Sequence, residues 1–311
     1  MKKFMIYAAC ATMLASCSND DDFAPQDGLK DTPITVSVGV NESSSRAGYE
    51  GISELPKEFY LTITQDAVNT ASQYNYTNVL MTKGADNDYN SATKMLWKDN
   101  SRNVAVNAYT TEAETFSVQT DQSTAEGVIN SDLLGAVSTT DGDVAIDNSQ
   151  ITINFRHLLC KLDVTFKWGK ELATVADKAI TDVEYKDFGM SVALNREACT
   201  IDKGETTGNI KGYVTTADEG VTYLSEAIFA PLMGETPKIV ITTEIATGGS
   251  DAVERRIFSI NVKAPEGGFV AGRRYTMNVS IGGTPIENES VTATISDGWG
   301  EIIPGDDMST N

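Results

Sequence analysis

Residues 33–40 read PITVSVGV, and after the proline an apolar side chain occupies every second position. Ile34, Val36, Val38 and Val40 would share one face of an extended chain, and the small or polar residues between them would share the other. This period of two predicts a β-strand with one buried face, because a strand places successive side chains on opposite sides of its sheet. One strand cannot bury such a face alone, so the stretch also predicts a sheet that it joins.

The same pattern recurs along most of the chain in short runs separated by Gly, Asn, Asp and Thr, which predicts an all-β protein. Further strands are expected at 58–65, 103–110, 115–120, 151–155, 158–166, 238–245, 256–262, 274–281 and 291–295. Only residues 171–179 indicate a helical turn or two. One apolar core rarely grows beyond about 250 residues, so this length favours two β-sandwich domains. Their break is expected near residue 150, at the end of the polar, turn-rich stretch 139–150.

Residues 1–16 have the composition of an export signal: two lysines, an apolar run and small residues immediately before Cys17. The apolar run, residues 4–14, is too short to cross a bilayer, which takes about 20 helical residues. Its junction with Cys17 resembles the bacterial lipobox, in which the cysteine becomes the first mature residue and carries fatty acids such as palmitate. The aspartates at 20–22 resemble the acidic signal that sends lipoproteins of some Gram-negative bacteria to the outer surface. We therefore expect a surface-exposed lipoprotein of the cell outer membrane.

The chain is strongly acidic. It carries 44 Asp and Glu residues against 24 Lys and Arg residues, a net charge of −20. Such a surface repels phosphate groups, so nucleic acid and anionic lipid are poor candidates for partners. The same charge favours solubility at a crowded cell surface.

Few groups are suited to catalysis or metal binding. His157 is the one histidine, and no nucleophile motif accompanies it. The stretch DNDYN at 86–90 opens with the spacing of a calcium loop, but Ser91 stands where the loop needs glycine and Trp97 where it needs glutamate. We therefore expect a structural or surface histidine, a solvated turn at 86–90, and no metal, cofactor or enzymatic activity.

Of the four cysteines, Cys10 lies in the N-terminal signal and Cys17, directly after it, is the expected lipidation site. Cys160 and Cys199 remain, and export places them in an oxidising compartment. They form either one disulfide or two separate buried thiols, and both alternatives stay open because sequence does not give the distance between them. No cysteine has the spacing of a zinc site.

The strand at 33–40 is followed by a polar loop, NESSSRAGYEG at 41–51, whose single basic residue, Arg46, precedes Ala47. Exposed loops rich in Ser and Gly are preferred sites of proteolysis, and an arginine before a small residue suits a trypsin-like protease. A protease could therefore reach the bond between Arg46 and Ala47. Taken alone, however, the loop favours the alternative that Arg46 is one surface charge in a flexible linker.

Taken together, these stretches resemble the fimbrillin family, the subunits of type V pili of Gram-negative gut and oral bacteria. The matching pieces are the lipobox at Cys17, the strand 33–40 with Arg46 and Ala47 after it, and the stretches 154–166, 229–232, 269–281 and 295–301. The resemblance implies two tandem transthyretin-like β-sandwich domains, at 47–150 and 151–311. A signal peptide at 1–16 and a lipidated leader at 17–46 would precede them.

The resemblance also implies a structural pilus subunit. An Arg-specific, trypsin-like protease would cut after Arg46, and the leader strand formed by Ile34, Val36, Val38 and Val40 would leave a groove. A strand of the next pilin subunit would fill the groove by donor-strand exchange. The expected partners are other pilin subunits, the protease, the outer membrane through the lipid on Cys17, and a host or bacterial surface receptor.

The short C-terminal tail bears on the place of the subunit in the pilus. Only EIIPGDDMSTN follows Gly300, and Pro304 is expected to interrupt any strand there. Either residues 291–299 are donated, or the subunit accepts a strand and gives none, which favours a tip or minor pilin. The alternatives to a pilin are a glycan-binding surface lipoprotein that keeps its anchor and, third, a secreted hydrolase.

Overall fold

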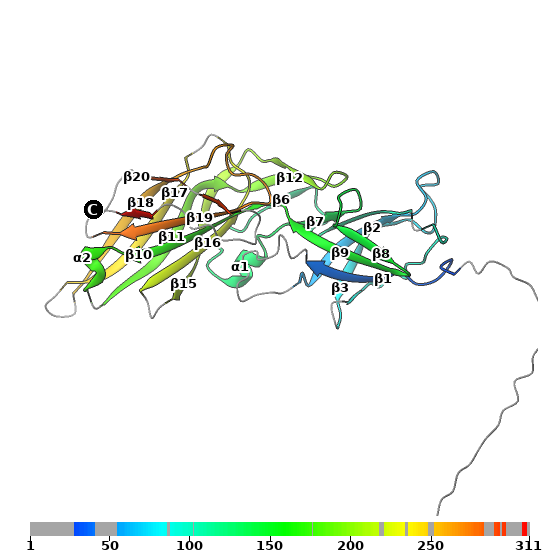
Figure 1. The fold of residues 1–311 in the computed structure, drawn as a ribbon, viewed down its shortest axis with the longest axis horizontal. Helices are drawn as coiled ribbons and strands as arrows, with labels where there is room; N and C mark the ends of the chain where they lie inside the picture. The colour runs from blue at the N-terminus through cyan, green and yellow to red at the C-terminus, as the bar shows by residue number, and fades with distance from the viewer. Residues whose placement is uncertain are drawn as a thin grey trace, which may run out of the picture.

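The structure is a computed structural model, which describes residues 28–40, 55–85, 88–101, 103–175, 177–217, 221–233, 236–247, 252–282, 289–292, 294–296 and 307–309. Nearly all of its regular structure is β-strand, which confirms the all-β prediction. These ranges contain two short helices, α1 (Ala125–Ile129) and α2 (Lys170–Ala173). No helix within them is long and apolar enough to cross a membrane. The strands form two groups that follow one another along an elongated molecule (Figure 1).

The first group is one eight-stranded sheet. Its strands are β1 (Thr35–Val40), β2 (Glu58–Thr64), β3 (Tyr76–Lys83), β4 (Asp88–Asn90), β5 (Ala105–Tyr109), β7 (Leu134–Val137), β8 (Val144–Asp147) and β9 (Gln150–His157). Their order is β1-β4-β3-β2-β5-β7-β9-β8, and β1 also pairs with β9. The strands from β1 to β9 in this order therefore form a closed ring, and β8 lies beside β9 outside the ring.

The second group contains the remaining strands. They are β6 (Thr115–Ser117), β10 (Cys160–Trp168), β11 (Lys178–Gly189), β12 (Ser191–Asn195), β13 (Thr200–Lys203), β14 (Thr207–Lys211), β15 (Tyr213–Ala217), β16 (Thr222–Phe229), β17 (Lys238–Ala246), β18 (Val253–Lys263), β19 (Arg274–Ile281), β20 (Glu289–Thr292), β21 (Thr294–Ser296) and β22 (Asp307–Ser309). One sheet has the order β15-β16-β10-β19-β21 with β22 also on β19, another has β14-β11-β17-β18-β20, and β13-β12-β6 form a small third sheet. Aromatic side chains join the two larger sheets: Tyr185, Phe188, Phe229, Phe269 and Tyr275 are in sequential contact, with ring centroids 4.8 to 5.4 Å apart.

Each group has its own apolar core. Ile151, Ile153 and Phe155 on β9 belong to the first core, so β9 is part of the first group. The domain break predicted near residue 150 is therefore too early, because the chain passes to the second group after His157. The polar stretch 139–150 is not a linker, since it contains β8, which forms a hairpin with β9.

One segment before β7 packs with the second group. Strand β6 pairs with β12, and Val118, Val128 and Leu133 belong to the second core. Helix α1 begins after Thr124, whose side-chain oxygen accepts a hydrogen bond from the Gly127 N–H at 3.1 Å. A helix this short shows no helical period in the sequence, so it was not predicted. Residues from β6 to α1 thus pack with the second group, β7 to β9 belong to the first group, and all strands from β10 onward belong to the second.

Two other segments differ from the sequence-based expectation. The helix predicted at 171–179 is only α2, because strand β11 begins at Lys178. Pro304 was expected to interrupt any strand in the tail, but β22 pairs in parallel with β19 from Asn278↔Asp307 onward. A proline removes a hydrogen-bond donor only at its own position, so a strand can begin after it.

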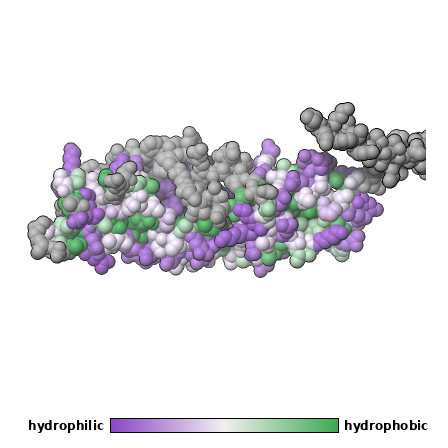
Figure 2. All heavy atoms as spheres, turned by 90° about the horizontal axis from the view of Figure 1, so that it is seen from below, coloured by the Kyte–Doolittle hydropathy of each residue, from purple (hydrophilic) through white to green (hydrophobic). Residues whose placement is uncertain are grey.

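The surface of the described residues is mixed in character. Eight large apolar side chains on it are well exposed, at Val68, Leu80, Val221, Leu224, Met233, Val253, Ile257 and Val270. They are spread over both groups of strands, and hydrophilic and apolar residues are interspersed on the face in Figure 2. Scattered exposed apolar residues are normal in soluble proteins, so they identify no docking surface by themselves.

Cys160 and Cys199 are two free, buried thiols. Burial raises the pKa of both, which keeps them protonated and unreactive at neutral pH. We expect neither to react with iodoacetamide in the folded protein, and both to react after unfolding in urea without reductant. Peptide mass spectrometry checks this, and a peptide pair cross-linked through Cys160 and Cys199 would contradict it.

Candidate functional site

Strand β1 lies between β9 and β4, and it is the one described strand that pairs with both. All six of its residues pair in parallel with β9, from Thr35↔Gln150 to Val40↔Phe155. On its other edge β1 pairs antiparallel with β4, where Val36 is opposite Tyr89. Without β1 the ring would be open between β9 and β4, and the edge of β9 would be a template for another strand.

The residues that lead into β1 are also held. The Asp31 N–H donates to the Trp97 carbonyl at 2.8 Å, and the Ile34 N–H donates to the Met95 carbonyl at 2.9 Å. The Tyr74 hydroxyl donates to the Asp31 carboxylate at 2.7 Å. The chain is therefore held at Asp31 and Ile34 before β1 begins, as well as by the strand pairs of β1.

The side chains of β1 fill the interior of the ring. Ile34, Val36 and Val38 are 8%, 2% and 4% exposed. They belong to one cluster with Phe59, Leu61, Met81, Tyr89, Trp97, Ile151, Ile153 and Phe155. At roughly 1.5–3 kcal/mol for each buried aliphatic side chain, the three contribute about 4.5–9 kcal/mol before any entropy cost. The space that these side chains fill, between β9 and β4, is an apolar groove. We expect the first group to need a strand in this groove to remain folded.

Aromatic rings form the floor of this groove. The Phe59 ring lies 4.9 Å from that of Tyr89 and 5.2 Å from that of Phe155, measured between centroids. The Tyr89 hydroxyl donates to the Pro56 carbonyl at 2.5 Å, and burial raises the pKa of Tyr89 to about 12. Tyr89 therefore remains a neutral donor that ties β4 to the segment before β2.

The position of Tyr89 corrects one prediction. Sequence analysis expected a solvated turn at 86–90, but Asp88–Asn90 form β4, and Tyr89 is only 4% exposed. A three-residue strand with one inward side chain is too short to show a period of two. No group of three or more His, Cys, Asp or Glu residues in the described part of the chain could hold a metal ion.

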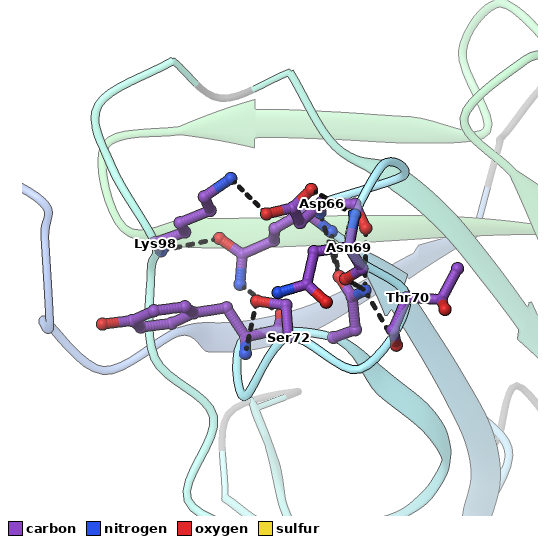
Figure 3. Close-up of polar contacts among 8 residues, drawn as sticks. Asp66, Asn69, Thr70, Ser72 and Lys98 are labelled. Atoms are coloured by element: carbon purple, nitrogen blue, oxygen red, sulfur yellow. Dashed lines mark hydrogen bonds and ion pairs between the residues drawn. The ribbon is translucent and has the colours of Figure 1, made fainter.

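The loop between β2 and β3 holds the segment beside the leader through polar contacts (Figure 3). The Lys98 ammonium lies 2.7 Å from an Asp66 carboxylate oxygen, and this hydrogen bond lowers the pKa of Asp66. The Gln65 side chain accepts a hydrogen bond from the Lys98 N–H and donates one to the Leu96 carbonyl, both at 2.8 Å. These bonds fix residues 96–98 next to the chain that enters β1.

The two edges of the groove are packed differently. On the β4 side only two residues of β1 pair, and a cavity of about 300 Å³ lies beside them. Its lining includes Ile34, Val36, Met81, Tyr89 and Met95. The six-residue pairing on the β9 side is continuous, so β9 provides the main template for β1.

The predicted site residues divide into two sets. Ile34, Val36 and Val38 are buried in the first core, and Val40 is the last residue of β1. Cys17, Arg46 and Ala47, the predicted lipidation and cleavage residues, lie outside the described residues. Sequence analysis did not identify the residues that line the groove, although Phe59 and Phe155 lie in two of the expected strands, 58–65 and 151–155.

The single histidine has a structural environment. His157 is 8% exposed, and its Nδ1 lies 2.8 Å from an Asp132 carboxylate oxygen that is also buried. Asp132 belongs to the segment between α1 and β7, so this contact joins the end of β9 to the chain that crosses between the groups.

Comparison with known proteins identifies relatives. A family model described as fimbrillin-like matches residues 57–299. The fold is similar to a candidate cell adhesion protein from Bacteroides ovatus, with 17% identity over 90% of this chain and 99% of that one and a TM-score of 0.56. It is also similar to one from Bacteroides uniformis, with 20% identity over 88% and 99% and a TM-score of 0.51. No curated protein sequence matches. The two structural neighbours support the fold alone at this identity.

A charge placed in the groove should release β1. We expect Val36→Asp to lower the free energy of unfolding by roughly 3–5 kcal/mol, because it buries an unpaired carboxylate. Thr35→Asp is the matched control, since Thr35 is an exposed neighbour on the same strand. Urea denaturation followed by tryptophan fluorescence measures both. Equal unfolding midpoints for the two variants would contradict the burial of Val36 in the first core.

Proposed function

This chain belongs to the fimbrillin-like family, and we propose that it is a structural pilus subunit that assembles by donor-strand exchange after cleavage at Arg46. One observation carries the proposal: a single N-terminal strand closes the ring of the first group. That strand precedes the described remainder of the fold, so one cut between Val40 and Leu55 would separate it. Arg46 is the only basic residue in this interval.

The cut is required because of the tether. A linker keeps β1 near its groove at an effective concentration on the order of millimolar, so a strand of another subunit cannot compete with it. Cleavage converts β1 into a separate peptide whose departure exposes the β9 edge and the apolar groove. A strand from another subunit can then add to the exposed edge, with main-chain bonds giving affinity and alternate side chains giving register.

The arrangement favours a filament. The groove of β1 lies in the first group, whereas β20 and the other C-terminal strands lie in the second, toward the other end of the molecule (Figure 1). A head-to-tail contact between such different surfaces gives a fibre when its rotation does not close a ring, and in a tip subunit only the accepting surface would be used. The partners in this proposal are other pilin subunits and a trypsin-like, Arg-specific protease, and the role involves no catalytic step.

We assign the subunit to a tip or minor position. The C-terminal strands β20, β21 and β22 are short, and each is paired with β18 or β19 of its own chain. A subunit whose C-terminal strands stay paired in this way accepts a donor but gives none. A receptor on a host or bacterial surface would then be its remaining partner.

The finer organisation is also part of the proposal. Residues 1–16 are a signal peptide, and residues 17–46 are a leader attached to the outer membrane through palmitate and other lipid on Cys17. Two transthyretin-like β-sandwich domains follow. The two separate cores support this division, with the boundary moved from residue 150 to the chain after His157.

Mass spectrometry of the protein isolated from cells tests the processing step. We expect the chain in pili to begin at Ala47, because removal of the leader is what opens the groove. A glycan-binding lipoprotein that keeps its anchor would instead retain an acylated Cys17. An acylated Cys17 at the N-terminus of the mature protein on the cell surface would overturn the pilin assignment.

Substitution of the cleavage residue tests the link between processing and assembly. We expect Arg46→Ala to be exported normally and to remain unpolymerised, since its tethered β1 keeps the groove occupied. Lys30→Ala is the matched control, because it removes an exposed basic residue of the same leader without touching the cut. Electron microscopy and heat-resistant oligomers on gels measure polymerisation. Normal pili in the Arg46→Ala strain would contradict the mechanism.

A further inference from the structure

A cavity begins where β1 ends. Its volume is about 390 Å³, within the range of roughly 300–1,000 Å³ typical of ligand pockets. Its apolar lining consists of Leu55, Pro56, Phe116, Ile129, Leu134 and Phe155. We call this cavity the terminal pocket.

The terminal pocket continues the path of β1 along β9. The last register pair of β1 is Val40 with Phe155, and Phe155 also lines the terminal pocket. The next inward-facing residue of β9 is His157, which lines the pocket as well. A strand that kept the register of β1 and ran two residues further would therefore come opposite His157, with its inward side chain at the pocket.

Both groups of strands contribute to the terminal pocket. Leu134 and Phe155 come from the first sheet, whereas Ile129 lies on α1 and Phe116 on β6, which pairs with the second group. In Figure 1 the tip of β1 points toward α1, at the junction of the two groups. A side chain in this pocket would contact both groups at once.

The chemistry of the pocket favours an apolar occupant. The Asp132 carboxylate already contacts His157 at 2.8 Å. The other polar residues of the lining are Lys57, Glu58, Thr110, Glu126 and Asn130. The leader offers no suitable side chain, since Asn41, Glu42 and Ser43 follow Val40. A carboxylate at the second of these positions cannot bury apolar surface against Phe116, Ile129 and Phe155, as an apolar side chain can.

We propose that the terminal pocket receives an apolar side chain of the incoming donor strand, two residues beyond the position of Val40. The inference rests on the proposed strand exchange and adds a contact that would make the donor bind more tightly than the leader. The donor makes the contacts that β1 makes and one more, which the leader of this chain cannot make. Exchange after cleavage is then favoured by the difference between the two strands, and the longer strand locks both groups together.

Peptides that differ at one position test the inference. The protein is cut after Arg46 and loaded with a fluorescent peptide of residues 33–42, PITVSVGVNE, or with its Glu42→Phe or Asn41→Phe variant. Position 42 is in phase with the buried row of β1, and position 41 is out of phase and serves as the control. Dissociation is followed by anisotropy during a chase with unlabelled peptide.

We expect the Glu42→Phe peptide to dissociate at least about tenfold more slowly than the native peptide, and the Asn41→Phe peptide to match the native one. In the uncut chain, Glu42→Phe should likewise slow loss of the leader after cleavage. Equal rates for both phenylalanine peptides would overturn the terminal pocket while leaving strand exchange intact. If no peptide, the native one included, entered the cut protein, the groove would not be exchangeable and both proposals would fail.

Discussion

The structure depends on one strand pairing: β1 against β9, which closes the ring of the first group. The two strands lie far apart in the sequence, and their six paired positions join the first described strand to the last strand of the same sheet. Three aliphatic side chains of β1 complete the interior. Two further sets of contacts lie beside this strand. The ring of Phe59 packs against those of Tyr89 and Phe155, and Lys98 forms an ion pair with Asp66.

This constraint links stability to assembly. Because β1 covers the edge of β9 over six residues, that edge is not available to another strand while β1 is in place. In the proposed mechanism the same pairing becomes intermolecular once the tether is cut, because backbone hydrogen bonds and a row of alternate apolar side chains do not depend on which chain supplies the strand. In the same proposal the terminal pocket would favour a donor over the leader, and its position between the two groups would let the donor contact both.

Much of this could be predicted from sequence, and the failures have physical causes. The period of two identified β1, β2 and β9, because each has one buried face over several residues. It missed β4, where Tyr89 is the single inward residue, and α1, which is too short for a helical period. It also missed β3, β7, β8 and the strands from β11 to β16. The closure of the ring could not be predicted, since periodicity shows which face of a strand is buried and not which strands pair. The domain break was misplaced because β8 and its turns are polar enough to resemble a linker.

Hydrogen–deuterium exchange of the protein before and after the cut at Arg46 tests the central claim most directly. The account predicts that β4 and the β9 amides facing β1 are protected in the uncut chain and lose protection once the leader is removed, while the second core, for example β10 and β17, stays protected. Protection should return when a donor strand binds. Unchanged exchange of β9 and β4 after loss of residues up to Arg46 would contradict the account, because it would mean that β1 does not close the ring.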